Sequence, residues 1–67
     1  MNDELKIQQH FTYDQLPKHI QVVAAPFHDL ALHIVHGTAP GPERTAALRK
    51  LLEARDAAVR AKVHPGS

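Results

Sequence analysis

The stretch Gly37-Thr-Ala-Pro-Gly-Pro42 decides the fold, because it separates two segments that have helical periodicity. Two prolines and two glycines within six residues cannot continue a helix, so this stretch is expected to be a tight loop. A short loop between two amphipathic helices predicts an antiparallel αα-hairpin. We therefore expect an all-α chain with one domain over residues 1–67. Its expected parts are an N-terminal arm (1–16), helices at 17–36 and 43–63, and a tail (64–67).

The segment before the loop has one apolar face. Asp14 is the expected N-cap of this helix, and Gly37 is expected just beyond its C-terminal end. Pro26 removes one backbone hydrogen bond, so it predicts a kink in the helix or a break after Ala25. Apolar residues that recur every three or four positions form the face that we expect to be buried: Ile20, Val23, Phe27, Leu30, Ala31 and Ile34.

The segment after the loop is also amphipathic. On its outer face, Arg49 and Glu53 stand at i,i+4 spacing, and so do Asp56 and Arg60, which predicts two surface ion pairs. The side expected to pack against the first helix carries leucines, valines and alanines: Ala47, Leu48, Leu51, Leu52, Ala54, Ala58, Val59 and Val63.

Length and composition limit the stability of a single copy. The chain has 67 residues, three aromatic residues and ten alanines. A core of this size rarely contributes more than ~3–5 kcal/mol, so we expect the hairpin to bury its remaining apolar surface by self-assembly. The absence of cysteine excludes a disulfide scaffold, a zinc finger and a thiol enzyme, and it fits a reducing cytoplasm. No apolar run approaches the ~20 residues that a membrane span needs, and no signal-peptide pattern is present.

The charged residues argue against several classes of function. A net charge of +1 is too small for a general DNA or RNA binder. His33 and His36 share a helix turn, but a closed zinc site needs four ligands, so we expect no metal and no cofactor. A hairpin has little interior in which to desolvate a catalytic group, so we expect no enzyme activity.

Basic residues concentrate in the second half of the chain. From residue 43 onward, six basic residues face three acidic ones. The start of the second helix is where a phosphate would meet Arg44, Thr45 and free backbone N–H groups. A solvated basic face explains the same pattern without any ligand.

The arm contains the aromatic segment Phe11-Thr-Tyr13. One interpretation is a hydrophobic clasp that packs the arm onto the hairpin or onto a neighbouring subunit. The other is a stacking surface, since an aromatic ring against a nucleobase is worth roughly 1–3 kcal/mol. The spacing does not distinguish the two.

Three stretches together resemble the small phage anti-CBASS proteins, the helical-hairpin "sponges" for cyclic oligonucleotide signals. These stretches are Phe11-Thr-Tyr13, Leu30-Ala-Leu-His-Ile-Val35, and the long run Gly41-Pro-Glu-Arg-Thr-Ala-Ala-Leu-Arg-Lys-Leu-Leu-Glu-Ala-Arg-Asp-Ala-Ala-Val-Arg-Ala61. The resemblance covers residues 11–61. Its most specific part is the Glu-Arg-Thr-x-Ala-Leu-x-Lys-Leu-x-Glu-Ala pattern that opens the second helix.

The resemblance implies a phage-encoded protein of the host cytoplasm that assembles into a hexamer. Cyclic dinucleotides such as 3′,3′-cGAMP would bind between neighbouring protomers, and cyclic trinucleotides at a separate place. The ligand would be held without cleavage, away from the CBASS effector that it activates.

The resemblance also implies ligand-binding residues. Tyr13 matches a family tyrosine that stacks on a base, and Phe11 belongs to the same segment. The basic position that contacts phosphate falls on His28, where lysine is commoner in the family. Histidine carries a full positive charge only in mildly acidic solution, so Lys18 is an alternative for this contact. Arg44 and Thr45 match the opening of the family's second helix.

A second hypothesis needs no nucleotide. In it, the chain is a small helical oligomerisation or protein-interaction module, and its aromatic residues are interface anchors.

Overall fold

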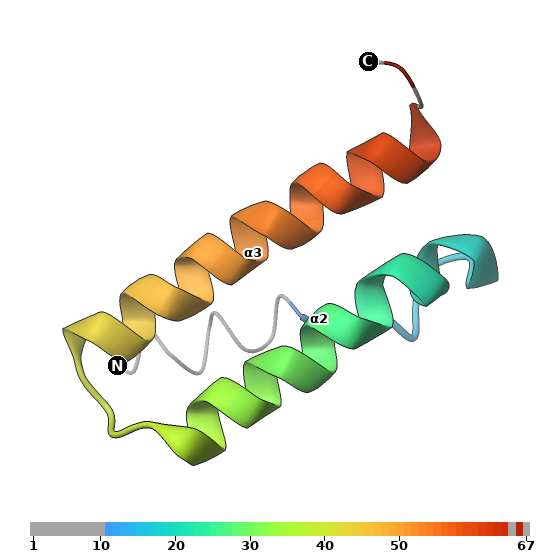
Figure 1. Ribbon diagram of the computed structural model, residues 1–67. Helices are drawn as coiled ribbons and strands as arrows, with labels where there is room; N and C mark the ends of the chain where they lie inside the picture. The colour runs from blue at the N-terminus through green and yellow to red at the C-terminus, as the bar shows by residue number, and fades with distance from the viewer. Residues whose placement is uncertain (1–10, 65, 67) are drawn as a thin grey trace.

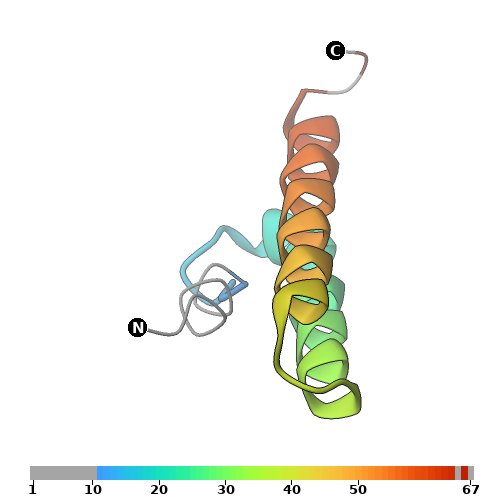
Figure 2. The ribbon, with the colours of Figure 1, turned by 90° about the vertical axis from the view of Figure 1, so that its left-hand side faces the viewer.

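The computed structural model describes residues 11–64 and 66, and it shows a two-helix hairpin after a short N-terminal stretch (Figure 1). Helix α2 spans Lys18–Gly37 and helix α3 spans Pro42–Val63. The helices run side by side in opposite directions, and the described part of the arm, residues 11–16, lies along one side of the hairpin (Figure 2). The predicted hairpin is confirmed, with helix ends within one residue of those expected. Assembly into an oligomer stays a prediction.

The start of α2 differs from the prediction. Asp14 does not cap the helix; Pro17 holds the N-cap position, without a side-chain cap bond. The Pro17 carbonyl instead accepts hydrogen bonds from the backbone N–H groups of Ile20 and Gln21, both at 2.9 Å. Because a proline disfavours helical geometry in the residue before it, the helix cannot extend back to Asp14. The Gln21 side chain donates to the Leu16 carbonyl at 2.7 Å and so ties the arm to the helix.

Pro26 lies inside α2 without ending it. The helix runs from residue 18 to 37, so the predicted alternative of a break after Ala25 is wrong. Proline cannot donate to the carbonyl four residues earlier, which belongs to Val22. Both Pro26 and Val22 are exposed, so solvent can satisfy this carbonyl. The position of the proline on the exposed side explains why the helix tolerates it.

The end of α2 is capped by side chains. Gly37 is the last residue of the helix, whereas it was predicted to lie just beyond the helix end. The Thr38 hydroxyl donates to the Ile34 carbonyl at 2.7 Å. Arg44 Nη1, from the first turn of α3, donates to the carbonyls of Val35 and Thr38, each at 2.7 Å. These bonds satisfy carbonyls that a helix end otherwise leaves unpaired, so no left-handed glycine is needed.

The loop ends at Gly41, which precedes α3 with φ +156° and ψ −179°. This backbone conformation is almost restricted to glycine. Pro42 follows as the first helical residue, where its missing N–H costs nothing, and Glu43 places a negative charge in the first turn. The loop sequence therefore accounts for the point at which the chain reverses and α3 begins.

The core lies where the arm meets both helices. Phe11 is only 1% exposed and is buried together with Ala31 of α2 and Leu48 of α3. Small residues, Ala24 among them, form much of the buried face of α2. That face is therefore rotated from the predicted one, and Leu30, which we expected to be buried, is 46% exposed. Larger apolar residues pack around this centre: Phe27, Ile34, Val35, Leu51 and Leu52.

The C-terminal part of α3 also differs from the expected apolar side. Val63 and Ala54 are exposed, whereas Val59 and Ala58 are half-buried. The contact with α2 thus buries fewer apolar residues of α3 than the sequence pattern predicted.

Arg44→Met should lower the free energy of unfolding by about 1–2 kcal/mol, because it removes two charged hydrogen bonds to carbonyls at partly exposed positions. Urea denaturation followed by circular dichroism measures this change. Arg49→Met, on the exposed side of the same helix, is the control and should change stability by less than about 0.5 kcal/mol. Equal effects of the two substitutions would contradict the capping role.

Candidate ligand-binding site

The arm brings Tyr13 against His28 in the middle of α2. The centroids of the two rings lie 5.2 Å apart with an interplanar angle of 70°, an edge-to-face contact. The Leu16 backbone N–H donates to the Tyr13 carbonyl at 3.0 Å, which fixes the turn that carries the tyrosine. Tyr13 is half-buried and the His28 side chain is 31% exposed, so part of each ring is accessible to a ligand.

One nitrogen of His28 is buried without a hydrogen bond. Nδ1 has no such partner, and the nearest carboxylate oxygen, Asp29 Oδ1, lies 3.6 Å away, beyond hydrogen-bonding distance. The Asp29 side chain is itself largely exposed to water. A buried polar atom without a partner costs about 1–3 kcal/mol, which makes His28 an unusual residue to find at this position. A ligand would meet the exposed part of the ring and not Nδ1.

Lys18, the alternative phosphate contact, is exposed at the start of α2. Ten residues separate it from His28, or about 15 Å along the helix axis. Of the two candidate cations, His28 is the one that contacts the tyrosine ring.

Arg44 and Thr45 lie at the other end of the hairpin. The Arg44 guanidinium is bonded to the end of α2, as described above. The Thr45 backbone N–H donates to the Gly41 carbonyl at 3.1 Å, so it is not a free donor. Nine residues of α2, about 14 Å along the axis, separate His28 from Gly37 at this end. A single chain therefore does not bring Arg44 and Thr45 together with Tyr13.

Phe11 behaves as the hydrophobic clasp of the arm. Its ring is buried in the core, so no face is available to a base while the arm stays packed. The two aromatic residues of the arm thus have different surroundings: Phe11 holds the arm on the hairpin, and Tyr13 reaches the surface.

Arg55 is a residue that the sequence analysis missed. Its side chain is 17% exposed, and its guanidinium carbon lies 6.0 Å from the centroid of the Phe11 ring. Nη2 and Nε of Arg55 donate to Asp56 Oδ1 at 2.8 and 3.2 Å. The signal was present in the spacing, since Arg55 stands seven residues after Leu48 and four before Val59, within the buried stripe of α3.

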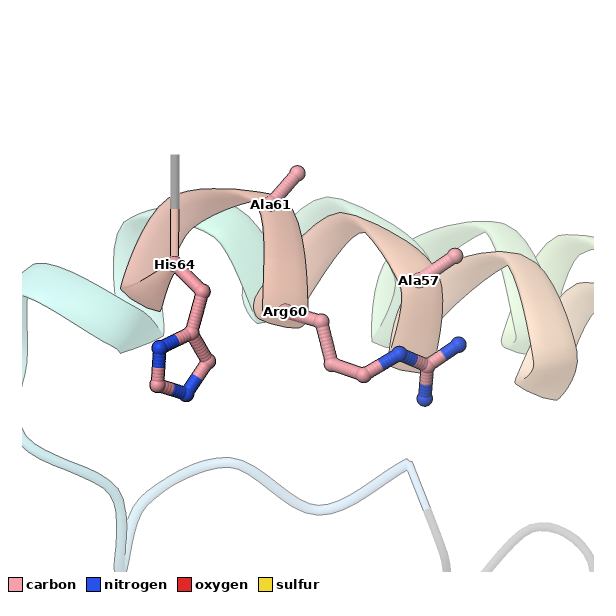
Figure 3. A pocket seen from close by; sticks show the side chains of 4 residues that line it. All are labelled: Ala57, Arg60, Ala61 and His64. Carbon is pink, nitrogen blue, oxygen red and sulfur yellow. The ribbon is translucent and has the colours of Figure 1, made fainter. Parts of the chain in front are cut away.

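A second accessible region lies near the end of α3. Ala57, Arg60, Ala61 and His64 line a pocket of about 350 Å³, shown in Figure 3. From its spacing, Arg60 was predicted only to form a surface ion pair with Asp56. The carboxylate of Asp56 instead binds Arg55.

Among residues 11–64 and 66, no three histidine, cysteine, aspartate or glutamate side chains are placed to hold a metal ion. Neither described helix has the length and hydropathy needed to span a membrane. Comparisons with protein-family models, with curated proteins and with solved structures gave no match to this chain.

Phe11→Ala should cost about 3 kcal/mol or more, because it empties the centre of the core, whereas Tyr13→Ala should cost only about 1 kcal/mol. The loss at Phe11 approaches the whole stability expected of a chain of this size, so the variant should lose its cooperative thermal transition. Thermal melting followed by circular dichroism compares the two. A Tyr13→Ala variant that melts as poorly as Phe11→Ala would contradict the division of roles within the arm.

Proposed function

We propose that this chain binds cyclic oligonucleotides and holds them without cleaving them. The expected ligands are cyclic dinucleotides such as 3′,3′-cGAMP, cyclic trinucleotides, or both. The binding form would be a homo-oligomer, with a hexamer as the expected assembly. In an infected cell, a phage protein of this kind would keep the signal from its CBASS effector in the host cytoplasm. The supporting observation is the contact between Tyr13 and His28, two of the residues that the family resemblance implies as ligand contacts.

The chemistry of the two rings suits such a ligand. An aromatic ring can stack on any base, and stacking is worth roughly 1–3 kcal/mol for each base. Because Nδ1 is buried, Nε2 is the nitrogen of His28 left to contact a phosphate oxygen, and it can donate a hydrogen bond in the protonated form and in the neutral form that carries its proton there. Sequestration requires affinity and slow release alone, and therefore needs no general acid, general base or nucleophile.

Self-assembly would complete the site. One chain supplies one tyrosine and one histidine, whereas a cyclic dinucleotide has two bases and two phosphates. Two copies of the Tyr13–His28 surface, related by a two-fold axis, would match the approximate two-fold symmetry of the ligand. The exposed apolar residues of α2 provide surface through which copies can associate.

Tyr13→Ala should weaken binding of 3′,3′-cGAMP by about tenfold or more, because it removes the stacking surface. Titration calorimetry with 3′,3′-cGAMP and with a cyclic triadenylate measures the loss, and recovery of intact nucleotide after heating shows that nothing is cleaved. Arg49→Gln, at an exposed position of α3, is the matched control and should bind as the unmodified chain does. The absence of heat with both ligands at tens of micromolar protein would refute the proposal.

A second candidate function, a helical interaction module without a nucleotide ligand, is favoured by one observation. Val22 is 74% exposed, Leu30 is 46% exposed, and the exposed Pro26 lies between them at i,i+4 spacing. These three residues form a continuous apolar stripe along α2, the kind of surface that protein interfaces bury.

Leu30→Glu should separate an assembly that forms through this stripe, because it buries a carboxylate in an apolar contact. Light scattering coupled to gel filtration gives the mass of each variant. Lys50→Glu is the control at an exposed position of α3, and it should leave the mass unchanged. A Leu30→Glu variant with the same mass as the unmodified chain would show that the stripe is not the interface.

A further inference from the structure

The pocket at the end of α3 combines the guanidinium of Arg60 and the imidazole of His64 with a small apolar wall. Arg60 and His64 stand one helical turn apart, and both point toward the side on which the arm runs (Figure 3). Ala57 and Ala61 complete the lining, and their methyl groups leave the space open. The volume of about 350 Å³ lies within the range of small-molecule sites.

The Arg60 guanidinium has no partner among the described residues. Its expected partner on the helix surface is Asp56, one turn earlier, but that carboxylate accepts both of its hydrogen bonds from Arg55. The ion pair of Asp56 is likewise with Arg55, at 2.8 Å. Arg60 thus presents a permanently charged fork of five N–H donors beside an open pocket.

A second hollow adjoins the first and shares Arg60. It has a volume of about 250 Å³, and Leu16 of the arm and Val59 of α3 contribute its apolar lining. Arg55 and Asp56, which bind each other, form its polar edge. Arg60 therefore lines both the hollow that contains His64 and the hollow that contains Leu16 and Val59, and a ligand with a charged and an apolar end could fill both.

The helix dipole accounts for part of this arrangement. Cations are favoured in the last turn of a helix, where Arg60 and Lys62 both lie. The dipole acts on either residue, but of the two only Arg60 lines the pocket. The i,i+4 spacing places Arg60 and His64 on the same face of the helix, beside this hollow.

We propose that this pocket binds the phosphate group of a small organic phosphate. Arg60 would bind two phosphate oxygens with its fork, and His64 would donate to a third. A carboxylate has only two oxygens, which the guanidinium alone would occupy, so the additional N–H donor of His64 favours a tetrahedral anion with a third oxygen. Leu16 and Val59 would cover the apolar part of the ligand. This inference goes beyond the proposed function, because it uses neither Tyr13 nor His28.

Titration of isotope-labelled protein by nuclear magnetic resonance tests the proposal. The probes are inorganic phosphate, phenyl phosphate and benzoate. Saturable shifts are expected for the Arg60 side-chain N–H and for the Ala57 and Ala61 amides, with phenyl phosphate the tightest and benzoate the weakest ligand. Arg60→Gln should weaken phenyl phosphate binding by roughly tenfold or more, since charged hydrogen bonds are lost.

Two control variants make the result specific. Lys62→Gln removes the same charge from the same helical turn without altering the pocket lining, so it should leave binding unchanged. Tyr13→Ala should also leave it unchanged. Shifts that do not saturate, or equal losses in Arg60→Gln and Lys62→Gln, would overturn the proposal. A loss of phenyl phosphate binding in Tyr13→Ala would assign the anion to the Tyr13–His28 surface and would also overturn the phosphate proposal. Failure of the cyclic nucleotide proposal alone would leave the phosphate proposal standing.

Discussion

The burial of Phe11 against Ala31 and Leu48 is the contact on which the rest of the structure depends. Two helices that meet through alanine and leucine leave a space between them, and the arm fills this space with an aromatic ring. The same contact fixes the residues that follow Phe11 in the chain. It places Tyr13 against His28 and Leu16 in the lining of the second hollow. Core formation therefore also builds the Tyr13–His28 surface and the Leu16 side of the second hollow.

Three arginines of α3 illustrate how similar residues acquire different roles from their positions. Arg44 faces the end of α2 and caps it. Arg55 faces the arm, with Asp56 to balance its charge and the Phe11 ring nearby. Arg60 lies one turn further on, where Asp56 is already bound, and its guanidinium faces a pocket. By charge alone, the three arginines would count as one basic face. The packing of α3 gives each of them a different role: one caps a helix, one lies beside the core and one lines a pocket.

The sequence predicted the hairpin well because helix periodicity and loop breakers are local signals. It predicted less well what depends on packing between segments. Leu30 belongs to the apolar periodicity of α2, yet alanines allow the closest approach to α3, so the buried face turns toward Ala24 and Ala31 and leaves Leu30 at the edge. For the site, two of the residues that the resemblance implies, Tyr13 and His28, lie in contact, whereas Arg44 and Thr45 lie at the other end of the hairpin. Nothing in the spacing distinguished the buried Phe11 from the half-buried Tyr13.

The shared dependence on the arm has a thermodynamic consequence. The Tyr13–His28 surface and the Leu16 wall of the second hollow, the one that shares Arg60 with the α3 pocket, exist together only while the arm is packed on the hairpin. A ligand that binds either surface binds the packed form better than the released form, so it must stabilise the packing of Phe11. By linkage, a ligand at one surface raises the population of the arm conformation that the other surface requires. In so small a chain, ligand binding at either surface and completion of the core are thus coupled through one aromatic residue.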